Sequence, residues 1–203
     1  MAQKLNIQQF FKQECVFAAG AAKYEQIPDS KLPEIAFIGK SNVGKSSLIN
    51  ALLNQRIARI SKTPGRTRQL NFFCLANKLN IVDMPGFGYA KVSKAEISSW
   101  QKMTYKYFAN RINLKRAFLL IDCRRGLQEN DLEMINIFNA VALSYQLVLT
   151  KIDELKKPEL EKSLAEIKNK SSKFAAQHPD ILMTSSQRNE GMDGLKKAIL
   201  DLL

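Results

Sequence analysis

Short apolar runs alternate along the chain with longer segments in which apolar residues recur at helical spacing. Six of the runs have the length of strands: Glu34–Gly39, Leu70–Leu75, Leu79–Asp83, Arg116–Asp122, Gln146–Thr150 and Ile181–Ser185. The first, fourth and fifth are almost continuously apolar, which is typical of strands buried on both faces. Because strands and helices alternate, the pattern predicts an α/β domain with a six-stranded, mostly parallel sheet and helices on both faces.

Three apolar stripes predict the helices that cover the later strands. Their members are Leu132, Ile135, Phe138 and Val141, then Leu160, Leu164, Ile167 and Phe174, and finally Leu195, Ala198, Ile199 and Leu202. Pro158 suits the first turn of the second helix, where a missing N–H leaves no hydrogen bond unmade. We interpret the stripes as core.

One domain is expected to hold most of the chain. The length of 203 residues fits a single core. Residues 1–30 precede the first predicted strand and end near the breaker-rich I-P-D-S-K-L-P, so they are interpreted as an appendage packed on the domain. Residues 31–203 then form the domain itself, which we expect to be monomeric.

The net charge and the cysteines indicate the class of partner and the cellular compartment. Lysine and arginine exceed aspartate and glutamate by 31 − 19 = +12, which favours a polyanionic partner such as nucleic acid or an anionic membrane surface. Cys15, Cys74 and Cys123 lie far apart among apolar neighbours, as reduced thiols do. With no apolar run of membrane-spanning length and no secretion signal, a cytoplasmic protein without stable membrane insertion is expected.

The strongest chemical motif follows the first strand. It has the form G-x-x-x-x-G-K-[ST] and stands between a strand and a helix-compatible segment. Its residues are Gly39, Lys40, Ser41, Asn42, Val43, Gly44, Lys45 and Ser46. Backbone N–H groups, the helix amino end and the Lys45 charge suit a β-phosphate, and the Ser46 hydroxyl suits Mg²⁺.

A second motif, D-x-x-G, ends the third predicted strand at Asp83, Met84, Pro85 and Gly86. The Asp83 carboxylate suits Mg²⁺ held through water, and the Gly86 N–H suits a γ-phosphate. Phe87 follows where many GTPases carry a glutamine that orients the attacking water, and a phenyl ring cannot make that hydrogen bond. Three routes to hydrolysis stay open: a water positioned by backbone, a cation in the site, or a group from a partner.

A third motif, T-K-I-D, follows the fifth predicted strand and is expected to bind the base of a nucleotide. Thr150, Lys151, Ile152 and Asp153 emerge where α/β proteins bind ligands. A carboxylate at Asp153 can accept both the ring N–H and the amino group of guanine, a pair of donors that adenine lacks. The backbone N–H groups of Thr184, Ser185 and Ser186 are expected to complete the pocket near the guanine oxygen.

Taken in order, G-K-S-N-V-G-K-S-S-L-I-N, S-K-T-P-G-R-T, D-M-P-G-F-G-Y-A, T-K-I-D and T-S-S resemble the EngB (YihA/YsxC) family of ribosome-biogenesis GTPases. The resemblance spans about residues 34–203 and includes a short N-terminal extension. A threonine opening the guanine motif and the F-G-Y-A tail are particular to this group. Lys40 is a departure, because members more often carry arginine there.

The resemblance implies a Ras-like P-loop GTPase domain of the translation-factor-related class that binds GTP, GDP and Mg²⁺. Within the loop that holds Gly65, Arg66 and Thr67, Thr67 would complete the Mg²⁺ coordination, and Thr63 is the competing candidate. Asn42 matches an asparagine that holds potassium in several relatives, although the same side chain also suits capping of local backbone. Potassium dependence is therefore a hypothesis.

Two basic segments flank the D-x-x-G motif. The first has no acidic residue and contains Arg56, Arg59, Lys62, Arg66 and Arg68, which suits ribosomal RNA. The second interleaves cations and aromatics: Lys102, Lys106, Arg111, Lys115 and Arg116 with Trp100, Tyr105 and Tyr107. The second either extends the first surface or is a solvated helix whose aromatic residues enter the core, with the core favoured for Trp100.

The leading hypothesis is a nucleotide-controlled assembly factor for the large ribosomal subunit, needed for normal growth and division. Its GTPase activity is expected to be slow and stimulated by potassium or the ribosome. The alternative is a GTPase that acts at the membrane or at the site of septation through its basic surface. A metabolic P-loop kinase is disfavoured, since no arginine-rich lid insertion is evident.

Overall fold

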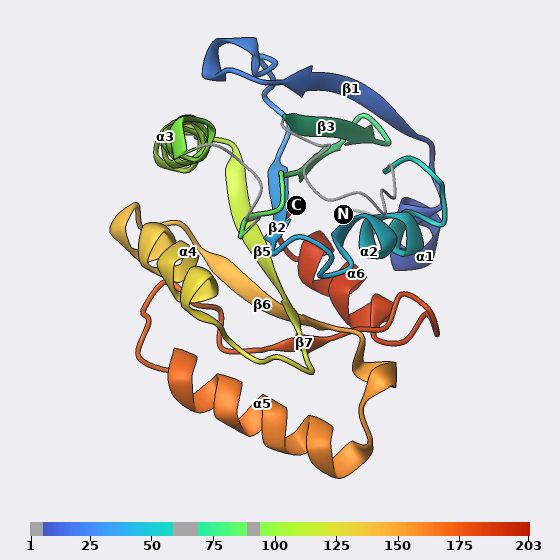
Figure 1. Ribbon diagram of the computed structural model, residues 1–203. Coiled ribbons are helices and arrows are strands. Elements are labelled where there is room, and N and C mark those ends of the chain that lie inside the picture. Colours follow the sequence, from blue (N-terminus) through green and yellow to red (C-terminus); the bar gives the residue numbers. More distant parts are fainter. Residues whose placement is uncertain (1–5, 59–68, 89–93) are drawn as a thin grey trace.

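The computed structural model of the protein describes residues 6–58, 69–88 and 94–203, with only the backbone described for residues 94–97 (Figure 1). Its described strands form a seven-stranded sheet in the order β1-β3-β4-β2-β5-β6-β7. The strands are β1 (Cys15–Ala21), β2 (Glu34–Gly39), β3 (Leu70–Leu75), β4 (Leu79–Asp83), β5 (Leu114–Asp122), β6 (Tyr145–Thr150) and β7 (Leu182–Met183). Neighbours from β4 to β7 pair in parallel, whereas β3 runs antiparallel to both β1 and β4.

Helices cover both faces of this sheet (Figure 1). They are α1 (Ile7–Phe11), α2 (Lys45–Leu53), α3 (Lys94–Asn110), α4 (Glu129–Ala140), α5 (Lys157–Ser171) and α6 (Met192–Leu200), with two short 3₁₀ turns, η1 (Tyr24–Gln26) and η2 (Ile152–Glu154). Helices α1, α2 and α6 share one buried cluster with the sheet, and α3, α4 and α5 share the other. The predicted α/β fold with helices on both faces is confirmed.

The expected number of strands needs a correction from six to seven. Each of the six predicted runs forms a strand, and the first three have the predicted bounds. The additional strand is β1, which pairs with β3 along the edge of the sheet and carries a bulge between Phe17 and Ala19. Residues 15–21 are thus a part of the sheet, where the sequence had indicated an appendage packed on the domain.

The predicted apolar stripes pack as core, although the helices are shorter than the stripes. Val141, Phe174 and Leu202 lie beyond the ends of α4, α5 and α6, yet each packs against one of the two clusters. Pro158 stands in the first turn of α5, as predicted. The three cysteines are unpaired, which fits the expected reduced thiols.

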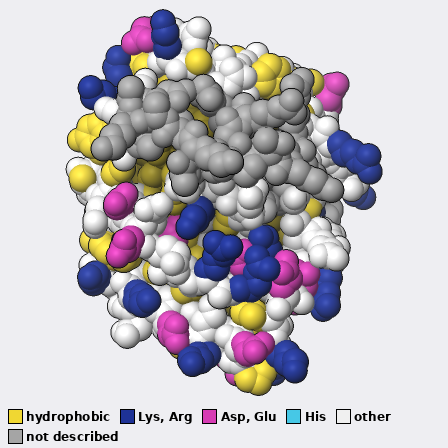
Figure 2. Space-filling model, in the orientation of Figure 1, with side chains coloured by type: hydrophobic (Ala, Val, Ile, Leu, Met, Phe, Trp, Pro, Cys, Tyr) yellow, Lys and Arg dark blue, Asp and Glu magenta, His cyan; other side chains and the backbone are white. Residues whose placement is uncertain are grey.

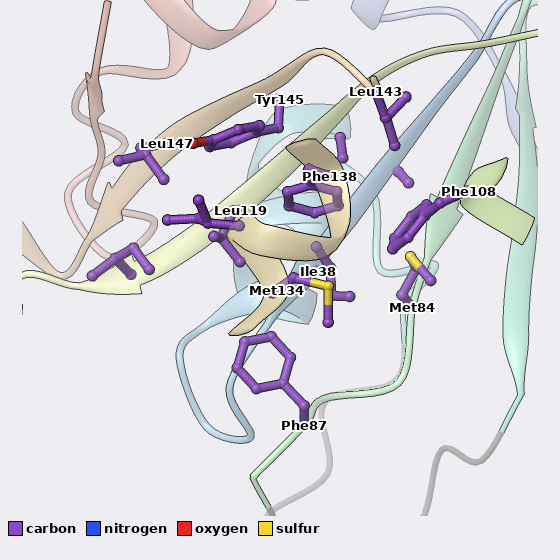
Figure 3. Close-up of a cluster of buried hydrophobic side chains, with 14 of the residues drawn as sticks. Ile38, Met84, Phe87, Phe108, Leu119, Met134, Phe138, Leu143, Tyr145 and Leu147 are labelled. Atoms are coloured by element: carbon purple, nitrogen blue, oxygen red, sulfur yellow. The ribbon is translucent and has the colours of Figure 1, made fainter. Parts of the chain in front are cut away.

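The segment that follows β4 contributes side chains to the buried cluster beneath α3 and α4. Figure 3 shows Met84 beside Phe108, and Phe87 near Met134 and the strand residue Ile38, all in one buried cluster. Phe87 is 7% exposed, so its ring belongs to the core. Core packing of Met84 and Phe87 therefore holds the D-x-x-G segment from within and from the residue that follows it.

A buried hydrogen-bond network lies at the opposite, amino end of the strands. The fully buried Glu34 carboxylate accepts hydrogen bonds from the Tyr107 hydroxyl at 2.6 Å and from the Arg111 guanidinium at 3.0 and 2.9 Å. Arg111 also donates to the Pro28 carbonyl at 3.0 Å. Burial, followed by the charge of Glu34, raises the pKa of Tyr107 well above its ordinary value. The network ties α3 to the start of β2.

This network shows which side chains of the second basic segment enter the core. Tyr107 is fully buried, Arg111 is paired with Glu34, and Trp100 packs against the core. Only part of that segment faces outward, including the half-exposed Tyr105. Trp100 and Tyr107 are therefore directed into the core, whereas the lysines of the segment, Lys102, Lys106 and Lys115, are exposed.

Candidate nucleotide-binding site

The predicted motifs meet at the carboxyl edge of the parallel strands. The loops after β2, β4, β6 and β7 leave the sheet at that edge, because these strands pair in parallel. Ligands of open α/β sheets bind at this end of the strands. The site is thus assembled from four loops that are distant in sequence.

The loop between β2 and α2 has the backbone of a phosphate cradle. Asn42 and Gly44 adopt positive φ angles of 66° and 104°, and α2 begins at Lys45 directly after Gly44. A Cβ atom at Gly39 would lie 2.9 Å from the Leu120 carbonyl oxygen, so only glycine fits there without a shift. The first N–H groups of a helix have no partner within the helix, which makes this start attractive to an anion.

Two charges converge beside the cradle. Lys45 Nζ forms an ion pair with Asp83 Oδ1, and the two side chains are 11% and 5% exposed. The next residue, Ser46, lies in the first turn of α2. A carboxylate and a hydroxyl are the hard oxygen donors that Mg²⁺ prefers, so the residues present fit the ion.

The D-x-x-G segment lies directly against the phosphate loop. Ser41 N donates to the Phe87 carbonyl at 3.1 Å, and Phe87 N donates to the Gly39 carbonyl at 3.3 Å. A Cβ at Gly86 would come within 2.9 Å of Ser41 Oγ, so a side chain at this position would push the two loops apart. A shift of Gly86 toward a phosphate would therefore also move the phosphate loop at Ser41.

Phe87 itself takes no part in a polar site. Its ring centroid lies 6.5 Å from that of Trp100, inside the cluster that Figure 3 shows. The phenyl group therefore packs the base of the D-x-x-G segment and cannot orient a water molecule.

Two side chains of the T-K-I-D segment donate hydrogen bonds to the backbone of the phosphate loop. Thr150 Oγ1 donates to the Val43 carbonyl at 2.7 Å, and Lys151 Nζ donates to the Asn42 carbonyl at 2.9 Å. Lys151 has a φ angle of 60°, and Asp153 follows in the turn η2. Asp153 is half-buried, and no hydrogen bond engages its carboxylate within the described parts of the chain. That carboxylate is available to a ligand.

The T-S-S segment differs from expectation in detail. The Thr184 N–H is paired with the Leu149 carbonyl at 2.7 Å, and the Ser185 N–H with the Glu190 carbonyl at 3.0 Å. Of the three N–H groups expected near a guanine oxygen, only that of Ser186 has no backbone partner among the described residues. The prediction therefore narrows from three donors to one.

Sequence reasoning missed Asp122, the last residue of β5. Its side chain is 9% exposed, and the carboxylate accepts hydrogen bonds from Lys151 Nζ at 2.9 Å and from Arg124 Nε and Nη2 at 2.8 and 2.6 Å. Burial raises its pKa, but the hydrogen bonds from Arg124 and Lys151 outweigh burial and lower it to about 2. A carboxylate ending a strand next to the T-K-I-D strand was the available signal.

Several predicted residues lie outside the described part of the chain. They are Thr63, Gly65, Arg66 and Thr67 of the proposed switch loop, the cations Arg59, Lys62 and Arg68, and Tyr89. Arg56 is described and exposed. On the face in Figure 2, described lysines and arginines gather near the centre beside acidic side chains. The described part of that face is thus of mixed sign.

Known sequences show what this chain is similar to. Residues 34–151 match the family described as 50S ribosome-binding GTPase. A probable GTP-binding protein EngB of Caulobacter vibrioides is 47% identical over 194 residues, which cover 95% of this chain and 85% of that relative. A protein of the same description from Rhizobium etli is 43% identical, over 92% of this chain and 90% of the relative.

Solved structures agree with this grouping. A crystal structure of a probable GTP-binding protein engB superposes with a TM-score of 0.65 at 26% identity, covering 83% of this chain and 97% of that one. Era in complex with MgGDPNP and a segment of 16S ribosomal RNA gives a TM-score of 0.67 at 26% identity, over 86% of this chain and 58% of Era. The fold is that of P-loop GTPases.

Proposed function

The chain belongs to the EngB family of GTP-binding proteins, within the 50S ribosome-binding GTPases, and from this premise we propose that it is a GTP-controlled assembly factor for the large ribosomal subunit. The observation that carries the proposal is the direct bonding of the phosphate loop to both the D-x-x-G and the T-K-I-D segments. A nucleotide bound across these loops would touch all of them at once.

Each part of the nucleotide has a proposed partner. The cradle from Gly39 to Ser46 binds the phosphates, with Lys45 as the charged donor. Asp153 reads guanine, and the Ser186 N–H lies beside the guanine oxygen. Met84, Pro85, Ile152, Thr184 and Ser185 complete the walls, and Gly65, Arg66 and Thr67 are proposed to close over the γ-phosphate.

Magnesium is proposed at Ser46 and Asp83, the latter through water, with Thr67 joining when GTP is bound. When bound, the ion neutralises the charge that develops on the phosphates during transfer. Asp83 would then hold the ion through water in place of its ion pair with Lys45, and Lys45 would be free to contact the phosphates. Gly86, already against Ser41, then offers its N–H to the γ-phosphate.

Slow intrinsic hydrolysis follows from the buried ring of Phe87, which leaves no water-orienting side chain at that position. We propose that hydrolysis is instead accelerated by a positive charge at the phosphates, supplied by a potassium ion near Asn42 or by a group of the ribosome. GTP turnover measured in potassium and in sodium buffers tests the first route. Equal rates in both would remove potassium from the proposal.

Ribosomal RNA is the proposed partner, and the cytoplasm the proposed compartment. The net charge of +12 suits a polyphosphate, and Arg56 with Arg59, Lys62, Arg66 and Arg68 forms the proposed contact surface. Era, which shares the fold, is seen with 16S ribosomal RNA. A switch loop that carries these cations would make RNA binding depend on the γ-phosphate.

Sucrose-gradient sedimentation with large ribosomal subunits tests the proposal. Comigration is expected with a non-hydrolysable GTP analogue and is expected to weaken with GDP. The matched control is Asp153→Asn, whose amide can donate to the oxygen that xanthine carries in place of the guanine amino group. This variant is expected to comigrate with the xanthosine analogue only. Equal weak binding in both nucleotide states would contradict the switch.

The same net charge also suits an anionic membrane surface, which keeps a second candidate: a GTPase acting at the membrane or division site. Within the described residues, no helix combines the length and apolarity needed to cross a bilayer. Surface attachment is therefore the form this candidate takes. Flotation with anionic liposomes distinguishes it from binding to ribosomal subunits.

A further inference from the structure

The last residue of β5 and the two residues after it contact residues 150–154 at four points. Asp122 pairs with Lys151 Nζ at 2.9 Å, and the Cys123 N–H donates to the Thr150 carbonyl at 3.1 Å. The Cys123 thiol donates to the Lys151 carbonyl at 3.2 Å, and Arg124 Nη1 forms an ion pair with the Glu154 carboxylate. Residues 122–124 thus contact both ends of residues 150–154, which we call the base loop.

The charges in these contacts alternate along a chain of four side chains. The order is Lys151, Asp122, Arg124 and Glu154. Both ends of this chain belong to the base loop, and Asp153 lies between them in sequence. The carboxylate proposed to read guanine is therefore flanked by two residues that one ionic network holds.

Lys151 connects the same network to the phosphate loop. Besides Asp122, its ammonium group contacts the Asn42 carbonyl at 2.9 Å, and its Cε atom lies 3.9 Å from the place of a Cβ on Gly44. The lysine stem therefore lies along the cradle. Without Asp122, one of the two contacts that hold the ammonium group would be lost.

The carboxylate at the centre of this ionic network is buried and fully paired. A buried carboxylate is costly unless cations and hydrogen bonds compensate it, and Asp122 receives both from a planar guanidinium fork. A pKa of about 2, lowered by Arg124 and Lys151 against the opposing effect of burial, keeps Asp122 ionised at neutral pH. Arg124 holds Asp122 with one side of its guanidinium and Glu154 with another.

We propose that Asp122 and Arg124 are positioning residues for guanine recognition, which hold Lys151 over the phosphate loop and orient the turn that carries Asp153. Neither residue touches the base. The inference rests on the proposed role of Asp153 as the guanine reader. A network that merely stabilised the fold would not affect which base is preferred, and this difference is measurable.

The test compares GDP with IDP, which lacks the amino group that Asp153 would accept. Dissociation constants are measured by displacement of fluorescent GDP from the wild type, Asp122→Asn and Arg124→Gln. The control is Glu25→Gln, which removes the carboxylate of an exposed ion pair with Lys106. Urea unfolding of each protein establishes that it is folded.

In both positioning variants the preference for GDP over IDP is expected to fall about tenfold, the scale of one hydrogen bond to a charged group. Glu25→Gln is expected to keep the wild-type ratio. Losses of GDP and IDP affinity by the same factor, or no loss, would overturn the inference. If Asp122→Asn does not fold, Arg124→Gln decides, because its side chain is 37% exposed and its loss opens no cavity.

ADP separates this inference from the proposed function. A wild type that binds GDP no better than ADP would contradict guanine recognition itself. A wild type that prefers GDP, together with positioning variants that keep the full preference over IDP, would contradict only the roles of Asp122 and Arg124.

Discussion

The two ends of the parallel strands each hold a buried carboxylate paired with an arginine, and the two networks differ in what they connect. At the amino end, Glu34 is fully buried and Arg111 is 13% exposed. At the carboxyl end, Asp122 is 9% and Arg124 37% exposed. The first network is sealed between β2 and α3, whereas the second ends on the loop that we propose reads the base.

This difference assigns the networks separate tasks. The contacts of Glu34 join a strand, a helix and the segment before the strand, so its loss would affect the whole fold. The contacts of Asp122 join loops at the edge where ligands bind. Similar chemistry is thus proposed to serve stability at one end and guanine recognition at the other.

The largest expected effect comes from Glu34→Ala. It leaves the Arg111 cation and the Tyr107 hydroxyl buried without their acceptor, which costs about 3–5 kcal/mol of unfolding free energy. Urea unfolding measures this loss, and the GDP dissociation constant of the folded protein is expected to stay as in the wild type. A variant of unchanged stability would contradict the role assigned to the amino end.

Asp153→Asn is expected to act on binding alone. The carboxylate is half-buried and makes no hydrogen bond within the described residues, so stability should be unaffected. Loss of the charged acceptor is expected to weaken GDP binding about a hundredfold, about 2–3 kcal/mol. Fluorescent GDP titration measures the loss. Full affinity for GDP would show that another group reads the base.

The pH dependence of stability distinguishes Asp122 next. Because its folded-state pKa of about 2 lies below the ordinary value of 3.8, the ionised form stabilises the fold above about pH 4. This contribution, about 2 kcal/mol, is lost as the pH falls from 4 toward 2. The unfolding free energy of the wild type minus that of Asp122→Asn, measured from pH 6 downward, should follow that course. A gap independent of pH would contradict it.

The smallest effect is expected from Glu25→Gln. Its partner Lys106 is half-exposed, the two groups are 3.2 Å apart, and water and salt screen such a pair. Neither the urea midpoint nor the GDP dissociation constant should change measurably. A clear loss of stability would mean that exposed pairs also matter here, and the contrast between the networks would weaken.

The sequence predicted most of the sheet because buried strands leave a continuous apolar run. β2, β5 and β6 show such a run, and the predicted bounds match those of β2, β3 and β4. β1 was missed because C-V-F-A-A-G-A consists largely of small residues and lies at an edge. Its Val16 and Phe17 are 44% and 57% exposed, so the strand has no strong buried pattern.

The site was predictable where local spacing determines the chemistry. The phosphate-loop motif consists of glycines and a lysine close in sequence, and the positive φ of Gly44 and the start of α2 at Lys45 agree with the predicted loop and helix. Asp122 and Lys151 are 29 residues apart and meet only because β5 and β6 are neighbours in the sheet. The internal pairing of the Thr184 and Ser185 N–H groups likewise depends on folded geometry, through Leu149 and Glu190.

The stabilisation that GDP adds to folding tests the division between the two ends most directly. With magnesium present and GDP at a hundredfold excess over the wild-type dissociation constant, the wild type should gain about 2.7 kcal/mol of unfolding free energy. Glu34→Ala should start lower and gain the same amount, whereas Asp153→Asn should start at the wild-type value and gain only about 0.4 kcal/mol. Equal gains in the two variants would contradict the account.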